Sequence, residues 1–124
     1  MDAGSTFLLT QKDSHLWIVL SDPAIDAENV LIVNLTTAHH LKESVCLLEA
    51  GEHPWVCHRT CVNYADAKVV PLKSLYALKD KGLLRLQNPL SAALLQRVRE
   101  GAAPSVRMSL ENAQILIDQR LIDC

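Results

Sequence analysis

The chain has 124 residues, of which 49% are hydrophobic, 21% charged and 4% aromatic, and its formal net charge is −2. This length is typical of one domain that buries its core without metal or disulfide staples, and the few aromatic residues predict a core of Leu, Val, Ile and Ala. The slightly acidic balance excludes a large basic nucleic-acid footprint but permits a short cationic groove for a single strand.

The N-terminal segment has no basic region followed by a clean apolar run, and no apolar stretch approaches the ~18 residues of a membrane span. We therefore expect no signal peptide, no membrane association and a cytoplasmic location. Thiols stay reduced in that compartment, so the four cysteines are expected to be small core residues rather than disulfide partners.

The first half of the chain predicts strands. Four short segments are rich in Val, Ile and Leu and bounded by turn-forming residues: TFLLTQ, HLWIVLSD, VLIVNL and SVCLLEAG. In WVCHRTCV, Trp55 and Cys57 alternate with Val56 and His58, which predicts a strand with one packed face. AKVVPL predicts a further strand, with Pro71 marking its edge or end.

The second half has the period of helices. SLYALKDKG ends at Gly82 in a C′ position, PLSAALLQRVREG has Ser91 as a candidate N-cap, and SLENAQILIDQRLID has Ser109. The sequence thus predicts one α+β domain over residues 1–124. Its strands, over about residues 7–72, are expected to curl into a small antiparallel barrel, with the helices of about residues 73–124 packed on it.

The segment GEHPWVCHRTCVNY, residues 51–64, concentrates the side chains capable of chemistry. On an alternating strand Cys57 and Cys61 would lie about 13 Å apart, too far to bind one zinc ion together. A nucleophilic thiolate needs a base on its own face, and no glycine-rich oxyanion turn follows either cysteine. We therefore expect no bound metal and no cofactor.

Acid–base chemistry suits this segment better. His58 and Thr60 share a face of the predicted strand, and His53 precedes it. An imidazole accepts and donates protons near neutral pH, and the neighbouring Arg59 could hold a phosphate through two hydrogen bonds. The alternative is a solvated surface histidine beside a surface salt bridge.

Thr36 and Thr37 end the predicted strand VLIVNLTT. Hydroxyl and free N–H groups at a strand end often hold phosphate oxygens, although β-branched threonines are also ordinary strand formers.

The order of these segments resembles the MazF/PemK toxin family over about residues 7–101. Ser21–Pro23 matches the turn that ends one family strand, Asn34–Thr37 matches the end of the next, and Tyr64–Asp66 matches a later turn with an aspartate. The break at Gly82 and the helix that follows fit the C-terminal half of the family.

The resemblance implies an SH3-like barrel, a fold shared with the CcdB gyrase poisons, and a homodimer. It further implies a metal-independent endoribonuclease that cleaves single-stranded RNA and is held inactive by an antitoxin whose extended segment fills the RNA groove. The alternative is a non-enzymatic member that acts by binding a protein, as the gyrase poisons do, or a plain adaptor.

The resemblance also implies site residues. Thr36 takes the position of the family's site threonine, whereas the family's loop arginine has only Lys12 and His15 as cationic counterparts. On the later strand, His58 stands where some members have a basic residue and Thr60 where they have an acidic one.

A slip of one residue in that placement would promote Arg59 instead. The departures from the family pattern leave two alternatives: a histidine-driven nuclease with His53 or His58 as base and Arg59 holding phosphate, or an inactive member. The candidate catalytic residues are thus His58, Arg59, Thr36 and His53, and the candidate substrate-binding residues are Thr37, His15, Lys12 and Thr60.

Overall fold

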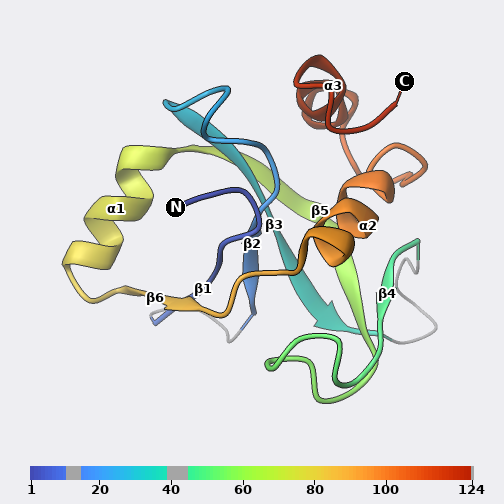
Figure 1. Cartoon of the computed structure of the whole chain (residues 1–124), viewed down its shortest axis with the longest axis horizontal. Helices are drawn as coiled ribbons and strands as arrows, with labels where there is room; N and C mark the ends of the chain where they lie inside the picture. The colour runs from blue at the N-terminus through green and yellow to red at the C-terminus, as the bar shows by residue number, and fades with distance from the viewer. Residues whose placement is uncertain (11–14, 39–44, 124) are drawn as a thin grey trace.

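Six antiparallel strands form one sheet, curled into a half-barrel, in the computed structural model, which describes residues 1–10, 15–38 and 45–123 (Figure 1). Their order across the sheet is β4-β5-β3-β2-β1-β6. The strands are β1 (Thr6–Leu9), β2 (Trp17–Val19), β3 (Asn29–Thr37), β4 (Leu47–Leu48), β5 (Thr60–Pro71) and β6 (Leu84–Gln87). With three helices in the described residues, the predicted α+β class is confirmed.

The helices are α1 (Leu72–Asp80), α2 (Ala92–Glu100) and α3 (Leu110–Asp118). Both predicted N-caps are confirmed: the Ser91 hydroxyl accepts from the Leu94 N–H, and the Ser109 hydroxyl accepts from the Asn112 N–H. Gly82 follows α1 with a φ of 75°, the left-handed conformation expected at C′. Within the described ranges no helix has the length and apolarity needed to cross a membrane.

Two parts of the predicted element order are wrong. The segment from residue 55 to Arg59 is not a strand, because β5 begins only at Thr60 and then continues without a break through the expected strand AKVVPL. Strand β6 lies among the helices, where no strand was expected, and pairs with β1. Because β6 is a short edge strand, its alternating pattern covers too few residues to stand out in the sequence.

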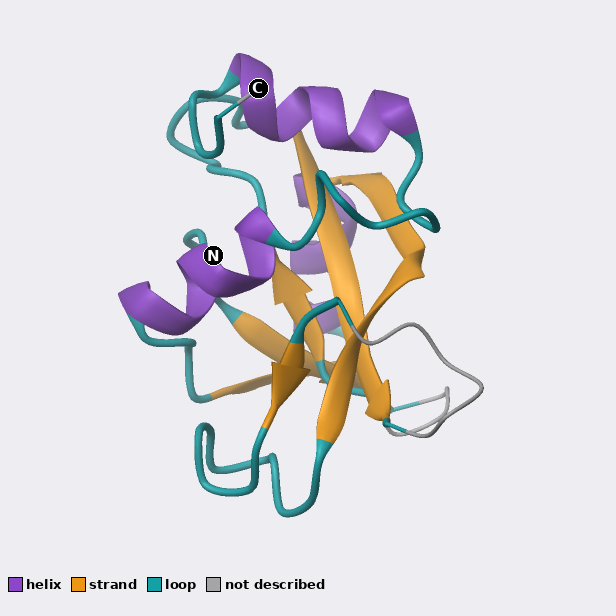
Figure 2. Ribbon diagram, turned by 90° about the vertical axis from the view of Figure 1, so that its right-hand side faces the viewer, coloured by secondary structure: helices purple, strands orange, loops and turns teal. Residues whose placement is uncertain are grey.

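The two faces of the sheet pack against different helices (Figures 1 and 2). On one, here the inner face, Leu31, Val33 and Leu35 of β3 belong to a core that includes buried residues of α2 and α3. On the other, the outer face, Val30 and Ile32 belong to a smaller core that includes Leu75 of α1.

The outer face is only partly covered by a helix. Helix α1 lies beside the start of β3 and the end of β5, while the C-terminal end of β3 lies at the opposite end of the sheet (Figure 1). Because side chains alternate along a strand, Asn34 and Thr36 continue the outer face beyond Ile32. This uncovered end of the outer face contains the candidate site.

Candidate functional site

Five of the eight candidate residues come together around one pocket of about 300 Å³ at the end of β3. Its lining residues are His15, Leu35, Thr36, Thr37, Trp55, His58 and Thr60. Three segments meet there: the residues just before β2, the end of β3 and the turn that enters β5. Since β2 and β5 flank β3 in the sheet, the two imidazoles approach the threonines from opposite sides.

His58 is exposed and held by its neighbours at the entrance to β5. The Thr60 hydroxyl donates to the His58 carbonyl at 2.9 Å, which fixes the backbone turn. The His58 ring has Nε2 at 3.1 Å from Thr37 Oγ1 and Nδ1 at 3.5 Å from Cys57 Sγ. The imidazole is therefore oriented by a hydroxyl of β3 and remains open to solvent for proton exchange.

His15 is half-buried at the opposite side of the pocket, and its Nδ1 lies 3.0 Å from the Leu35 carbonyl oxygen. A carbonyl can only accept, so Nδ1 carries the hydrogen. In the neutral ring Nε2 is then the nitrogen with a lone pair, as a general base requires. The sequence identified His15 only as a substrate-binding candidate.

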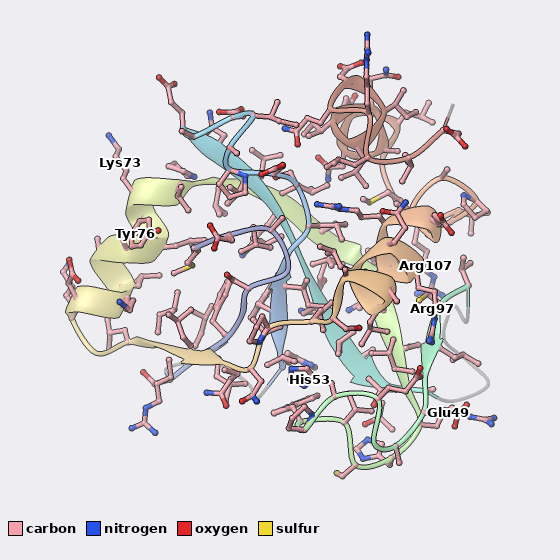
Figure 3. All side chains as sticks on the ribbon, in the orientation of Figure 1. Glu49, His53, Lys73, Tyr76, Arg97 and Arg107 are labelled. Atoms are coloured by element: carbon pink, nitrogen blue, oxygen red, sulfur yellow. The ribbon has the colours of Figure 1, made fainter. Side chains whose placement is uncertain are left out.

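His53 does not line the pocket. It is 4% exposed, its Nε2 donates to the Asn88 carbonyl at 2.6 Å, and its Nδ1 accepts from the Trp55 N–H at 3.1 Å. Both ring nitrogens are thus used in holding the loop before β5 (Figure 3). Pro54 follows as the second residue of a turn in which the Val56 N–H donates to the His53 carbonyl at 2.9 Å. His53 positions Trp55 rather than facing a substrate.

Arg59 does not line the pocket either. Its Nε donates to Glu49 Oε1 at 2.9 Å, and the two side chains are 64% and 55% exposed. An ion pair this exposed contributes about 0–1 kcal/mol, so a phosphate could replace the carboxylate at little cost. Lys12, the remaining candidate, lies outside the described residues.

Helix α2 braces the loop from the other side. Arg97 Nη1 donates to the Glu52 carboxylate, and its Nη2 donates to the Leu47 carbonyl at 2.6 Å. The hydrogen bond from Arg97 lowers the pKa of Glu52 below its usual value of 4.5. The loop that carries Trp55 is thereby tied to the helix that covers the inner face.

The cysteines fit the expected core role in part. Cys46 and Cys61 are buried, and burial raises the pKa of the Cys46 thiol. Cys57 is exposed, because the loop before β5 replaces the expected strand, and Cys124 lies outside the described residues. Within the described ranges no three His, Cys, Asp or Glu side chains converge closely enough to hold a metal ion.

A second pocket of about 490 Å³ adjoins the first and shares His15 with it. Its lining residues are Leu9, His15, Trp17, Asn34, Ala65, Asp66, Ala67 and Lys68. The register between β3 and β5 jumps from the pair Asn34–Asn63 to the pair Ile32–Lys68, so residues 64–67 bulge out of the ladder. Asn63 is the residue paired with Asn34, and Asp66, within the bulge, lies in hydrogen-bonding reach of Asn34, at 3.1 Å.

Neither Asn34 nor Lys68 is among the site residues expected from the sequence. The signal for Asn34 was present: a single amide interrupts the apolar run VLIVNL, where an unpaired polar group would be unfavourable. Lys68 gave no such signal, because its place near Asn34 follows from its pairing with Ile32 across the sheet.

Neither a scan against protein-family models nor a search of curated proteins finds a match to this chain. The likeness to MazF/PemK toxins therefore stays an expectation drawn from the sequence.

Proposed function

We propose that the chain is a metal-independent endoribonuclease of the MazF/PemK toxin type that cleaves single-stranded RNA. The observation that supports this most is the convergence of His15 and His58 on one pocket beside Thr36 and Thr37. Two imidazoles on opposite sides of a strand end supply the acid and the base that cleavage at a ribose 2′-hydroxyl requires. Each step of this cleavage is therefore assigned to a residue of the chain itself.

In the proposed reaction His15 Nε2 removes the proton of the 2′-hydroxyl, and the 2′-oxygen attacks the adjacent phosphorus. The bond from phosphorus to the 5′-oxygen breaks, and protonated His58 donates its proton to that leaving oxygen. The products are a 2′,3′-cyclic phosphate and a free 5′-hydroxyl. The Thr36 hydroxyl donates to a non-bridging phosphate oxygen, and Thr60 positions His58 through its hydrogen bond to the backbone.

The pocket also offers a surface suited to a single strand. Trp55 is part-buried against the core and lines the pocket, so one face of its indole is available to stack on an unpaired base. Arg59 lies one residue from His58 in a weak exposed ion pair with Glu49, and can exchange that carboxylate for a phosphate.

The resemblance extends the proposal to the assembly. The curled half-barrel would correspond to the SH3-like barrel of the family, and the protein would act in the cytoplasm as a homodimer under the control of an antitoxin. Strands β4 and β6 are the edges of the sheet, and an edge strand offers main-chain groups to an added antitoxin segment.

Incubation of the pure protein with mixed-sequence RNA, with and without EDTA, tests the activity. We expect cleavage that EDTA leaves unchanged and a bell-shaped pH profile, with 2′,3′-cyclic phosphate ends in the products. An RNA with a single 2′-deoxy nucleotide at the cleaved position should resist, because it lacks the attacking hydroxyl.

Alanine variants test the role proposed for each residue. We expect His15→Ala and His58→Ala each to slow cleavage by about 100-fold or more, as loss of a general acid or base does. Thr36→Ala should have a smaller effect and Arg59→Ala the smallest. Lys73→Ala is the matched control, since Lys73 lies on α1 at the opposite end of the molecule from His53 (Figure 3).

If the His15 and His58 variants cleave as fast as the parent, the proposed site is wrong. If no RNA is cleaved but the protein forms a stoichiometric complex with another protein, the non-enzymatic alternative replaces the nuclease.

A further inference from the structure

Asn34 is a buried amide with an unused oxygen. It is 1% exposed and lines the second pocket, its Nδ2 donates to Asp66 Oδ2 at 3.1 Å, and its Oδ1 has no hydrogen-bond partner among the described residues. A buried polar atom without a partner is unfavourable by about 1–3 kcal/mol in general. Such an atom at the wall of a pocket indicates a ligand that donates a hydrogen bond.

The charged groups at the rim define that ligand further. Asp66 is exposed, and the bond from Asn34 occupies only one of its two oxygens. The Lys68 ammonium lies 5.0 Å from the ring centroid of Trp17, which pairs with Asn34 across β2 and β3. The pocket therefore presents two adjacent acceptors, Asp66 and Asn34 Oδ1, together with a cationic donor.

We infer that this pocket is a guanine subsite. The Watson–Crick edge of guanine presents two adjacent donors, N1–H and the 2-amino group, followed by the O6 acceptor. The 2-amino group matches the carboxylate of Asp66, and N1–H matches the amide oxygen of Asn34, while Lys68 donates to O6. Adenine and cytosine place an acceptor nitrogen beside their one amino group, and uracil has one N–H between two carbonyls, so each would direct a lone pair at an acceptor.

Two features of the pocket bear on how the base enters. Asn34 Oδ1 is covered, so the base reaches it only after the pocket rearranges, and the exposed side chains of Asp66 and Lys68 at the rim can turn toward the base. The indole of Trp17 is 8% exposed beneath Lys68 and borders the space that a base would occupy.

The shared histidine sets the position of this base along the strand. His15 lines both pockets, so a guanine beside Asn34 would belong to a nucleotide adjacent to the phosphate held between His15 and His58. In this respect the inference rests on the proposed nuclease, and it deepens that proposal by naming guanine as the base next to the cut.

Equilibrium binding tests the subsite without any need for cleavage. Calorimetric titration of the parent protein with GMP, IMP, AMP, CMP and UMP should give the tightest binding for GMP. IMP lacks only the 2-amino group and should bind about tenfold more weakly, the usual effect of one lost hydrogen bond to a charged acceptor. Equal binding of GMP and IMP, or no GMP binding at millimolar concentration, would overturn the inference.

The variant Asp66→Asn tests the residue. Asp66 is exposed, so the fold should persist, but the amide replaces an acceptor and the preference for GMP over IMP should disappear. The matched control Asp80→Asn, at the end of α1, should keep the preference. Retention of the preference in Asp66→Asn would show that another group reads the base.

Mapping of RNA ends then separates the two proposals. If the parent cuts next to guanine and the Asp66→Asn variant cuts without regard to guanine, the nuclease and the subsite are both supported. Cuts with no relation to guanine reject the subsite and leave the nuclease standing. Guanine-selective binding without any cleavage keeps the subsite and rejects the nuclease.

Discussion

The two faces of the sheet differ in what the side chains of one strand, β3, contribute to them. On the inner face Leu31, Val33 and Leu35 of β3 are all apolar and lie in one core with residues of α2 and α3. On the outer face of β3 the apolar Val30 and Ile32 lie in the smaller core with Leu75 of α1, and Asn34 and Thr36 follow. These polar side chains lie at the end of the sheet away from α1, so β3 has a packing region beside the helix and a candidate binding region beyond it (Figure 1).

The largest effect is expected on the covered side, at Gly101, the C-cap residue that follows α2. A Cβ at Gly101 would lie 2.2 Å from the hydroxyl oxygen of Tyr64, which donates to the Val98 carbonyl at 2.6 Å. We expect Gly101→Ala to lower the free energy of unfolding by about 3 kcal/mol, since a close-packed core has no room for the added group. Urea denaturation measures the change.

The double variant of Gly101→Ala with Tyr64→Phe identifies the cause. Removal of the Tyr64 hydroxyl should itself lower the free energy of unfolding by about 1 kcal/mol, but it should also relieve part of the clash. The double variant should therefore lose less stability than the two single variants lose together. Strict additivity would mean that Tyr64 is not the obstacle.

The second prediction contrasts two histidines of the same segment. His53→Ala removes both hydrogen bonds of a buried ring and should destabilise the protein by about 2 kcal/mol. His58→Ala removes an exposed ring and should change stability by less than about 0.5 kcal/mol while slowing RNA cleavage far more. Thermal denaturation measures the stability of each variant, and cleavage assays measure its rate on RNA. Equal loss of stability in the two variants would contradict the roles assigned to them.

The third prediction concerns the uncovered end of the outer face, where we expect a substitution to stabilise the protein rather than destabilise it. Asn34→Leu removes a buried oxygen that has no partner and puts an apolar side chain of similar size in its place. We expect it to raise the free energy of unfolding by about 1 kcal/mol while weakening GMP binding, measured by urea denaturation and calorimetry. Its control on the inner face of the same strand, Val33→Asn, should be strongly destabilising. A destabilised Asn34→Leu would mean that the amide is retained for packing.

Much of the fold could be predicted from local patterns, because apolar runs and caps act over a few residues. Ser91 and Ser109 cap their helices as expected, and residues 30–35 of β3 form an apolar run interrupted only at Asn34. Strand β6 could not be predicted this way, since its four residues are held by pairing with β1, far away in the sequence.

The site followed from residue types but not from periodicity. His15, Thr36 and His58 were identified by their chemistry and the family resemblance, and the structure brings them to one pocket. The assignment of faces within WVCHRTCV was wrong because the turn at Pro54 overrides the alternation of the following residues. The hydrogen bond between Asn34 and Asp66 forms where the register of β3 and β5 shifts, and no pattern in β5 predicts that bulge.

The smallest expected effect concerns the link between the two sides, the bond from Arg97 of α2 to Glu52 in the loop before β5. Because Arg97 lowers the pKa of Glu52, the stabilisation is present above the unfolded pKa, near 4.5, and is lost as the pH falls through the lower folded pKa. Glu52→Gln should therefore reduce the free energy of unfolding at pH 7 by about 1 kcal/mol or less, as expected for a partly exposed pair. Denaturation of parent and variant between pH 7 and pH 3 should show the two curves converging in acid; a constant difference would mean that the carboxylate charge contributes nothing.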